Sequence, residues 1–240
     1  MISEESARKN LDALKYDIRQ ITDRDITIVA VTKTHPEEIF DLCVKLGVEH
    51  VGENRIQELL QKNRHRPDAR KKLKIHLIGP LQTNKVKFLP ENVDSFDALS
   101  SPETLEKIDQ RWNLDTPLSL LLQVNCTNEE QKSGLSLNSP DGKEEIFQLV
   151  DLCARSQKVR LEGLMTMGPT PAGNYDVEDP DYIKDTRASF LRLAALRNEI
   201  QDRLKIHLPR LSMGMTHDYK IAIECGATEI RVGSLLFGDR

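Results

Sequence analysis

The sequence lacks any apolar run of the roughly 18 residues that a membrane-spanning helix requires. It also begins without a recognisable targeting segment. The first residues, MISEESARKNLDALKYDIRQI, mix acidic side chains with a helical pattern, unlike a secretory signal or a transit peptide. We therefore expect a cytoplasmic protein with no membrane partner.

Metal-binding patterns are missing as well. The four cysteines, Cys43, Cys126, Cys153 and Cys225, are widely separated and form no CxxC pair, and the six histidines show no HxH or HExxH spacing. Structural zinc sites use closely spaced ligand pairs, so we expect no metal. The thiols are interpreted as reduced and mostly buried, as is usual in the cytosol.

An excess of positive charge is also absent. The chain has 34 Lys and Arg against 38 Asp and Glu, a formal net charge of −4, so it is not built to coat nucleic acid. One basic run, residues 62–74 (KNRHRPDARKKLK), holds seven Lys or Arg among its thirteen residues. Because no aromatic residues are interleaved, we interpret it as a solvated helix face or loop, with contact to phosphate backbones as the alternative. We expect no nucleic-acid partner.

What the sequence does have is a regular alternation of strands and helices. Strands are predicted at 26–32, 50–53, 74–79, 94–98, 118–125, 160–167, 209–213 and 229–232. Several of these runs are continuously apolar, as in parallel strands that are covered on both faces. Eight β/α units in 240 residues predict an α/β fold with one closed (β/α)8 TIM barrel, because closure removes edge strands.

Helix start signals separate the strands. They are Pro36 before EEIFDLCVKLG, Ser101-Pro102, Asp179-Pro180, and Thr216 as a cap for HDYKIAIEC. A capping side chain and a proline at the first helical position are typical of helix starts. Residues 3–20 predict an additional helix, so that 1–25 form an N-terminal helix and lead-in within a single domain, 1–240.

In barrels of this kind, chemistry lies at the C-terminal ends of the strands. Lys33 directly follows the apolar strand ITIVAVT. Desolvation at such a place lowers the pKa of an amine and makes it a usable Schiff-base nucleophile. A lysine whose amine reaches solvent from the strand end is the alternative that this position alone leaves open.

Two later strand ends carry residues suited to a phosphate. In LSMGMT, residues Ser212, Met213 and Gly214 combine a hydroxyl with backbone that can approach an anion, and RVGSLLFG leaves its strand at Gly233 and Ser234. The loops after strands seven and eight are where such barrels most often bind phosphate. For the first of these loops, an ordinary turn with a helix cap is the alternative.

Arg231 and Asn54 complete the candidate site. Arg231 lies on the same face of its strand as Gly233, so it can point into the barrel, toward a ligand or toward a glutamate in an internal ion pair. Asn54 ends the strand next to that of Lys33, where its amide can bond a cofactor ring oxygen or cap the following helix. An amine that faces a phosphate cradle fits a phosphorylated aldehyde.

Seven motifs closely resemble those of one family. In chain order they are AVTKTHP, VGENRIQE, HLIGPLQTNK, QKSG, GLMTMGP, LSMGMTHD and IRVGSLLFG, and they span residues 26–238. They are similar to the signatures of the pyridoxal phosphate homeostasis proteins, single-domain relatives of the alanine racemase N-terminal barrel. The resemblance implies that pyridoxal 5'-phosphate (PLP) is the cofactor and that Lys33 holds it as a Schiff base. It also implies the remaining contacts: phosphate to Ser212, Met213, Gly214, Gly233 and Ser234, pyridine nitrogen to Arg231, and the ring to Asn54.

The resemblance implies a carrier that maintains vitamin B6 homeostasis and can deliver PLP to apo-enzymes, and not an efficient enzyme. An arginine at the pyridine nitrogen disfavours ring protonation and weakens the cofactor as an electron sink. In racemases of this fold type, the second base is a tyrosine from a separate β domain of the partner subunit, for which we find no counterpart before Arg240. None of Tyr16, Tyr175, Tyr182 and Tyr219 lies at a predicted strand end. We expect a monomer. A slow amino-acid racemase is the alternative, and a Schiff-base aldolase is a more distant one.

Overall fold

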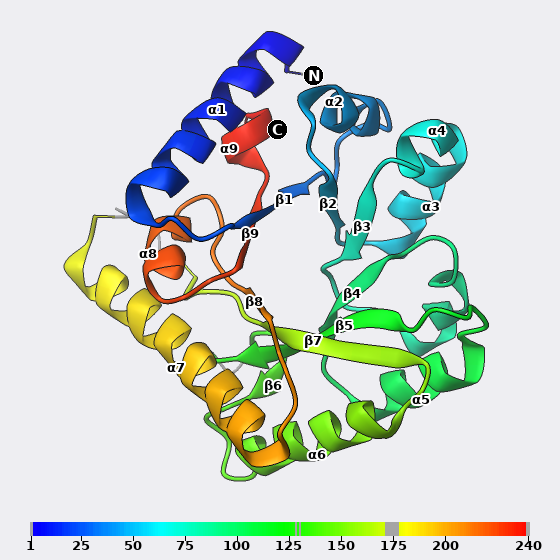
Figure 1. Ribbon diagram of the computed structural model, residues 1–240, viewed down its shortest axis with the longest axis vertical. Coiled ribbons are helices and arrows are strands. Elements are labelled where there is room, and N and C mark those ends of the chain that lie inside the picture. The colour runs from blue at the N-terminus through cyan, green and yellow to red at the C-terminus, as the bar shows by residue number, and fades with distance from the viewer. Residues whose placement is uncertain (1, 128, 130, 171–177, 239–240) are drawn as a thin grey trace.

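The strands of the molecule run parallel, and eight of them close into a barrel (Figure 1). The computed structural model describes residues 2–127, 129, 131–170 and 178–238. The strands are β1 (Thr27–Val31), β2 (His50–Glu53), β3 (Lys74–Leu77), β4 (Ser95–Leu99), β5 (Leu118–Asn125), β6 (Leu135–Ser136), β7 (Val159–Met165), β8 (Arg210–Ser212) and β9 (Glu229–Val232). Hydrogen bonding runs in the order β1-β2-β3-β4-β5-β7-β8-β9 and returns from β9 to β1. The predicted (β/α)8 barrel is confirmed.

The short strand β6 was not predicted from the sequence. It pairs in parallel with the last residues of β5, where Val124 lies opposite Leu135, and so adds a short strand beside the end of β5. Gly134 precedes it with φ +115°, and a Cβ at this position would lie 3.0 Å from the backbone nitrogen of Asn125. Two residues are too few to show a strand period, so only the folded chain reveals this element.

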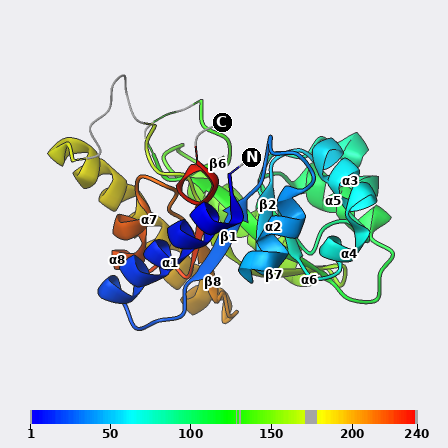
Figure 2. The same cartoon turned by 90° about the horizontal axis from the view of Figure 1, so that it is seen from above.

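Helices cover the outside of the barrel as a ring (Figures 1 and 2). They are α1 (Glu4–Ile21), α2 (Ile39–Leu46), α3 (Ile56–His65), α4 (Pro67–Arg70), the 3-10 helix η1 (Thr83–Phe88), α5 (Pro102–Arg111), α6 (Gly142–Arg155), α7 (Pro180–Leu204), α8 (Tyr219–Glu224) and α9 (Ser234–Phe237). The predicted additional helix is α1, which contacts α9 through a hydrogen bond from Asn10 Nδ2 to the carbonyl of Leu236 (3.1 Å). Within the described ranges, no helix combines the length and the apolar character that crossing a bilayer requires.

Two of the predicted helix starts are confirmed in detail. The Ser101 hydroxyl accepts a hydrogen bond from the backbone of Thr104 (3.2 Å), and the Asp179 carboxylate accepts one from the backbone of Asp181 (2.8 Å). Each satisfies a backbone donor that has no partner within its helix.

The predicted start at Pro36 is wrong, because α2 begins at Ile39. The backbone nitrogen of Ile39 donates to the carbonyl of Pro36 over 3.1 Å, an i to i+3 bond that gives a turn tighter than the α-helix. Proline therefore marks the turn that leads into the helix and not its first residue.

The core lies on both faces of the sheet. All eight residues of β5 are buried, which explains the continuous apolar runs of the sequence. Phe40, Phe96 and Phe190 are among the largest fully buried side chains and come from α2, β4 and α7. At Gly163 of β7, a Cβ would lie 1.7 Å from the carbonyl oxygen of Arg210, so only glycine lets β8 approach this closely.

Candidate functional site

A pocket of 340 Å³ opens where the barrel strands end. Its walls come from residues at or near the ends of β1, β2, β3, β5, β7 and β9, from the loop after β8 and from the segment before β6. They are Val31, Lys33, Asn54, Ile78, Gly79, Pro80, Gln123, Ser133, Met165, Met167, Met215, Thr216, His217, Arg231, Gly233 and Ser234. The volume lies at the lower end of the range of about 300–1,000 Å³ that is typical of small-molecule sites.

Five of the predicted site residues line this pocket together: Lys33, Asn54, Arg231, Gly233 and Ser234. They come from three strand ends that are distant in the sequence but adjacent in the barrel, because β1 pairs with both β2 and β9. The order of strands therefore brings the candidate amine and the candidate anion-binding loop to one mouth.

The other three predicted residues, Ser212, Met213 and Gly214, lie behind the pocket wall. Ser212 and Met213 are fully buried, and Gly214, at φ +97°, turns the chain so that the next residues reach the pocket. The loop after β8 thus presents Met215, Thr216 and His217 to the pocket in their place. The predicted loop thus lines the pocket through the residues that follow the three predicted ones.

Arg231 crosses the barrel interior beneath the pocket. Its Nη1 donates to the Ser212 hydroxyl (2.7 Å) and its Nη2 to the carbonyl of Thr166 (2.8 Å). Both acceptors are neutral, and in the described part of the chain no carboxylate lies within 4.0 Å of this guanidinium, so the predicted alternative of an internal ion pair is wrong there. Burial lowers the pKa of Arg231.

Two hydroxyls from neighbouring loops meet at the edge of the pocket. Thr216 Oγ1, after β8, lies 3.2 Å from Ser234 Oγ, after β9. Thr216 was predicted to cap the next helix, but the N-cap of α8 is Asp218, whose carboxylate accepts from the backbone of Met215 (2.5 Å). The Thr216 hydroxyl is therefore directed to Ser234. At Gly233, a Cβ would lie 3.1 Å from the carbonyl oxygen of Val31, which keeps this wall close to β1.

Asn54 lines the pocket at the end of β2 and does not cap a helix. The N-cap of α3 is Arg55, and no side chain caps this helix, so the capping alternative for Asn54 is wrong. A Cβ at Gly79 would lie 2.3 Å from the carbonyl oxygen of Asn54, so glycine brings the β3 loop close to Asn54.

Sequence reasoning missed several pocket residues: Val31, Gln123, Ser133, Met165, Met167 and Met215. Gln123 is a buried amide near the end of the otherwise largely apolar β5, and Met165 and Met167 alternate at the end of β7. A polar residue near the end of an apolar strand was the available signal for Gln123. The methionines gave no such signal, because a sequence does not distinguish an apolar residue that lines a pocket from one that packs in the core.

The tyrosines lie elsewhere. Tyr16 is exposed on α1, whereas Tyr182 and Tyr219 are buried in α7 and α8. The Tyr219 hydroxyl donates to the Asp17 carboxylate (2.9 Å). Tyr175 lies outside the described residues. Of the three described tyrosines, none lines the pocket.

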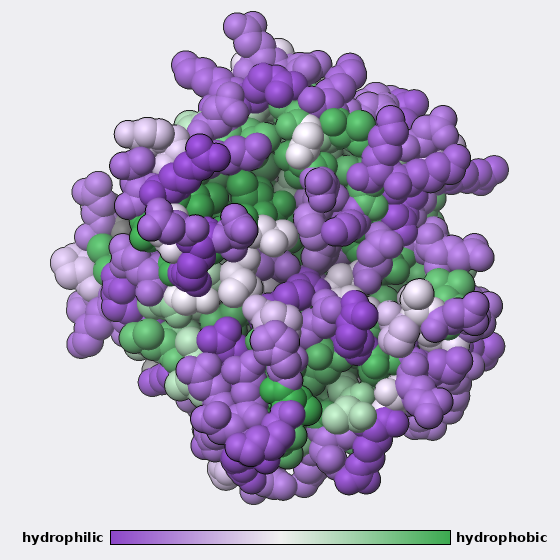
Figure 3. Space-filling model, viewed as in Figure 1, coloured by the Kyte–Doolittle hydropathy of each residue, from purple (hydrophilic) through white to green (hydrophobic). Residues whose placement is uncertain are grey.

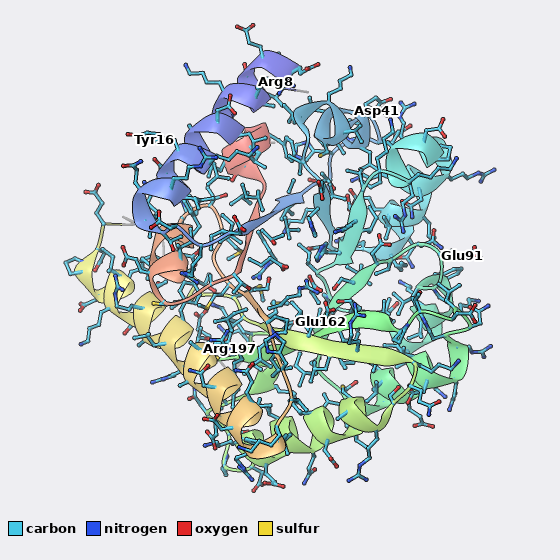
Figure 4. The ribbon with its side chains drawn as sticks, viewed as in Figure 1. Arg8, Tyr16, Asp41, Glu91, Glu162 and Arg197 are labelled. Atoms are coloured by element: carbon cyan, nitrogen blue, oxygen red, sulfur yellow. The ribbon has the colours of Figure 1, made fainter. Side chains whose placement is uncertain are left out.

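A second cavity, of 480 Å³, lies at the opposite end of the barrel, where the strands begin. Figure 4 shows Glu162, one of its lining residues, over the centre of the strands, and Figure 3 shows hydrophilic side chains gathered there. Donor atoms of His76, Asp97 and Glu229 lie within 4.8 Å of one another, as in a metal site. The Arg210 guanidinium, however, lies among them, with Nη2 at 3.2 Å from Asp97 and 3.0 Å from Glu229. A cationic side chain already compensates these carboxylates.

The comparisons with known proteins agree with this architecture. The sequence profile of the alanine racemase N-terminal domain family matches residues 9–240. Alanine racemase from E. faecalis superimposes with a TM-score of 0.73 at 17% identity, where this chain covers 59% of the racemase, a likeness that concerns the fold alone.

More similar relatives match over nearly their whole length. A pyridoxal phosphate homeostasis protein of Aquifex aeolicus is 36% identical over 214 residues, 89% of this chain and 86% of that protein. One of Schizosaccharomyces pombe is 34% identical over 237 residues, 96% and 91% of the two chains. PipY of Synechococcus elongatus, solved with PLP bound, has a TM-score of 0.79 at 28% identity and covers 97% of this chain and 100% of its own. The chain belongs to the family of pyridoxal phosphate homeostasis proteins.

Proposed function

We propose that this chain binds PLP in the pocket at the strand ends and serves PLP homeostasis. The observation that carries the proposal is that Lys33 lines the same pocket as the hydroxyl pair of Thr216 and Ser234. The primary amine of Lys33 suits the aldehyde of PLP, and the two hydroxyls can donate hydrogen bonds to its phosphate. PipY, which shares this fold, was solved with PLP bound.

Each part of the cofactor has a partner in the pocket. Lys33 would hold the aldehyde through its Nζ, as a Schiff base formed with loss of one water. Thr216, Ser234 and the backbone of Gly233 hold the phosphate. Asn54 and Arg231 line the pocket where they would contact the ring and its pyridine nitrogen. Ser212, predicted as a phosphate ligand, instead orients Arg231 through its 2.7 Å bond.

The pocket favours a carrier over an efficient racemase. PLP supplies an electron sink for carbanions when its ring nitrogen is protonated. Arg231, itself a cation, opposes that protonation. Among the described residues no tyrosine lines the pocket to serve as a second base. We propose that the chain holds PLP reversibly, acts as a monomer in the cytoplasm and passes the cofactor to apo-enzymes.

The test is to load the purified protein with PLP, reduce it with borohydride and map the modified lysine by mass spectrometry. We expect the pyridoxyl mass on Lys33, and both the mass and the Schiff-base absorbance should be lost in Lys33→Ala. Lys74→Ala is the control, since Lys74 lines the opposite cavity. Label on another lysine, or on none, contradicts the proposal. Amino-acid racemisation by the loaded protein within the usual enzyme range of about 1–10³ per second would favour the racemase.

A further inference from the structure

A buried ionic cluster lies behind β1 and β2, outside the pocket. Lys62 of α3, which sequence reasoning assigned to a solvated basic run, is only 3% exposed. Its ammonium lies 2.6 Å from Glu53 Oε1 and 2.9 Å from Glu58 Oε1. Glu53 is fully buried, and Glu58 keeps 23% of its side chain exposed. The solvated interpretation is therefore wrong at Lys62. Burying charged groups costs free energy even when they are paired, so we ask what this cluster does for the fold.

The cluster forms hydrogen bonds with the residues on both sides of Lys33. On the N-terminal side, Lys62 Nζ donates to the carbonyl of Thr32 (2.7 Å), and the Thr32 hydroxyl donates to Glu53 (2.6 Å). On the C-terminal side, the backbone nitrogen of Thr34 donates to Glu58 Oε1 (2.5 Å). Lys33 thus lies between two residues that are each bonded to the same group of charges.

The cluster holds Thr34 in a backbone conformation that threonine does not favour. Its φ is +65°, in the left-handed region that β-branched residues rarely adopt. Such a conformation persists only where the surroundings enforce it. The bond from Thr34 to Glu58 is a contact that can enforce it, and Lys62 in turn fixes the carboxylate of Glu58.

We propose that Lys62, Glu53 and Glu58 are positioning residues for the Schiff-base lysine. They hold the turn after β1 in a conformation that sends the Lys33 side chain into the pocket, and none of the three lines the pocket itself. This inference rests on the proposed function, since it concerns how Lys33 meets the aldehyde.

Glu58 offers the cleanest test, because it is partly exposed and its removal leaves the buried pair of Lys62 and Glu53 in place. We expect Glu58→Ala to weaken PLP binding about tenfold, as Thr34 returns to negative φ and Lys33 turns with it. Glu58→Gln keeps an acceptor oxygen at the same place and should bind PLP within about threefold of the wild type.

A second substitution separates positioning from a general loss of stability. Glycine adopts positive φ without strain, so Thr34→Gly combined with Glu58→Ala should recover most of the lost affinity. Because glycine also relieves strain and can raise stability, the free energy of unfolding of each variant is measured by urea denaturation; a loss of stability alone would leave the PLP affinity of the folded protein unchanged. Lys62→Arg and Lys62→Met form a further pair, in which arginine should retain more affinity than methionine.

The measurements are PLP titration by absorbance and borohydride mapping of each variant beside the wild type. If the wild type is labelled on Lys33 but Glu58→Ala binds PLP equally well, the positioning role is overturned and the proposed function stands. Equal weakening by Glu58→Ala with and without Thr34→Gly also overturns it. If the wild type carries no label on Lys33, both the inference and the proposed function fail.

Discussion

An arginine lies in the barrel interior at each end, and the two differ in their direct hydrogen-bond partners. Arg210, where the strands begin, lies within hydrogen-bond distance of the carboxylates of Asp97, Glu162 and Glu229. Arg231, where the strands end, bonds only to a hydroxyl and a backbone carbonyl.

The two arginines differ accordingly in pKa. Burial by itself would lower the pKa of Arg210, but the charges of Asp97 and Glu229 outweigh it and raise that pKa. For Arg231, burial dominates and lowers the pKa. Removing a buried cation that is matched by carboxylates leaves their charges buried and unpaired. A buried cation that bonds only to neutral groups leaves no such pair behind and is suited to a ligand.

Cavity size by itself would favour the strand-start end over the proposed site. The cavity around Arg210 is larger, at 480 Å³ against 340 Å³. Its donors and acceptors, however, are largely engaged with each other. The smaller pocket combines apolar walls with a few convergent polar groups, which is the usual character of a ligand site.

The largest expected effect comes from removing the charge of Arg210, which tests the contrast between the two arginines. Arg210→Met leaves Asp97 and Glu229 buried without their cation, so we expect a loss of about 3–5 kcal/mol in the free energy of unfolding. Urea denaturation at neutral pH measures it. Arg231→Met, as the matched variant, should lose less stability, because Arg231 bonds only to the neutral Ser212 and Thr166 and acts on Asp97, Asp218 and Glu229 from beyond ion-pair distance. Equal losses in the two variants would contradict the contrast between the two ends.

The next test concerns PLP affinity at the other end. We expect Arg231→Met to weaken PLP binding by about 1.5–3 kcal/mol, the usual value of a hydrogen bond to a charged group. Absorbance titration with PLP measures it. Arg231→Lys keeps the charge but not the planar fork that reaches Ser212 and Thr166 together, so it should recover little affinity. Full affinity in Arg231→Met would show that this arginine does not face the cofactor.

A smaller effect is expected from pH at the strand-start end. Burial, and then the charge of His76, lower the pKa of His50 to about 4 from an ordinary 6.5. Between these two values His50 is protonated in the unfolded chain but neutral in the folded protein, so the free energy of unfolding decreases as pH falls from 6.5 toward 4. The charged groups that act on His50 are His76, Lys74, Glu229 and Arg210.

The measurement for His50 is the unfolding free energy across this pH range in the wild type and in His50→Gln. The variant should lose less stability than the wild type on acidification, since it has no imidazole to titrate. His76 works in the opposite direction: burial opposes its charge, but Asp97 (2.7 Å) outweighs this and raises the pKa, so its contribution is lost only as pH rises above 6.5. Parallel curves for wild type and His50→Gln would contradict the lowered pKa of His50.

Local patterns in the sequence were sufficient for the eight barrel strands and for the place of Lys33 just after the first of them. The alternation of β-rich and helical runs located all eight barrel strands, several of them continuously apolar, and the capping of two helices by Ser101 and Asp179 was visible in the sequence. These features depend on neighbours a few residues apart, which is why a linear chain displays them. That Lys33 follows an apolar strand, and that Gly233 and Ser234 leave another, followed from the same local periods.

Only the tertiary structure decided which polar groups meet. Lys62 looked like part of a solvated basic run, yet it is buried because Glu53 and the carbonyl of Thr32, 30 residues away in sequence, lie beside it. The turn at Gly214, with φ +97°, decided that Thr216 and not Ser212 reaches the pocket. Such outcomes depend on strand register and on long-range approach, and no local period encodes either.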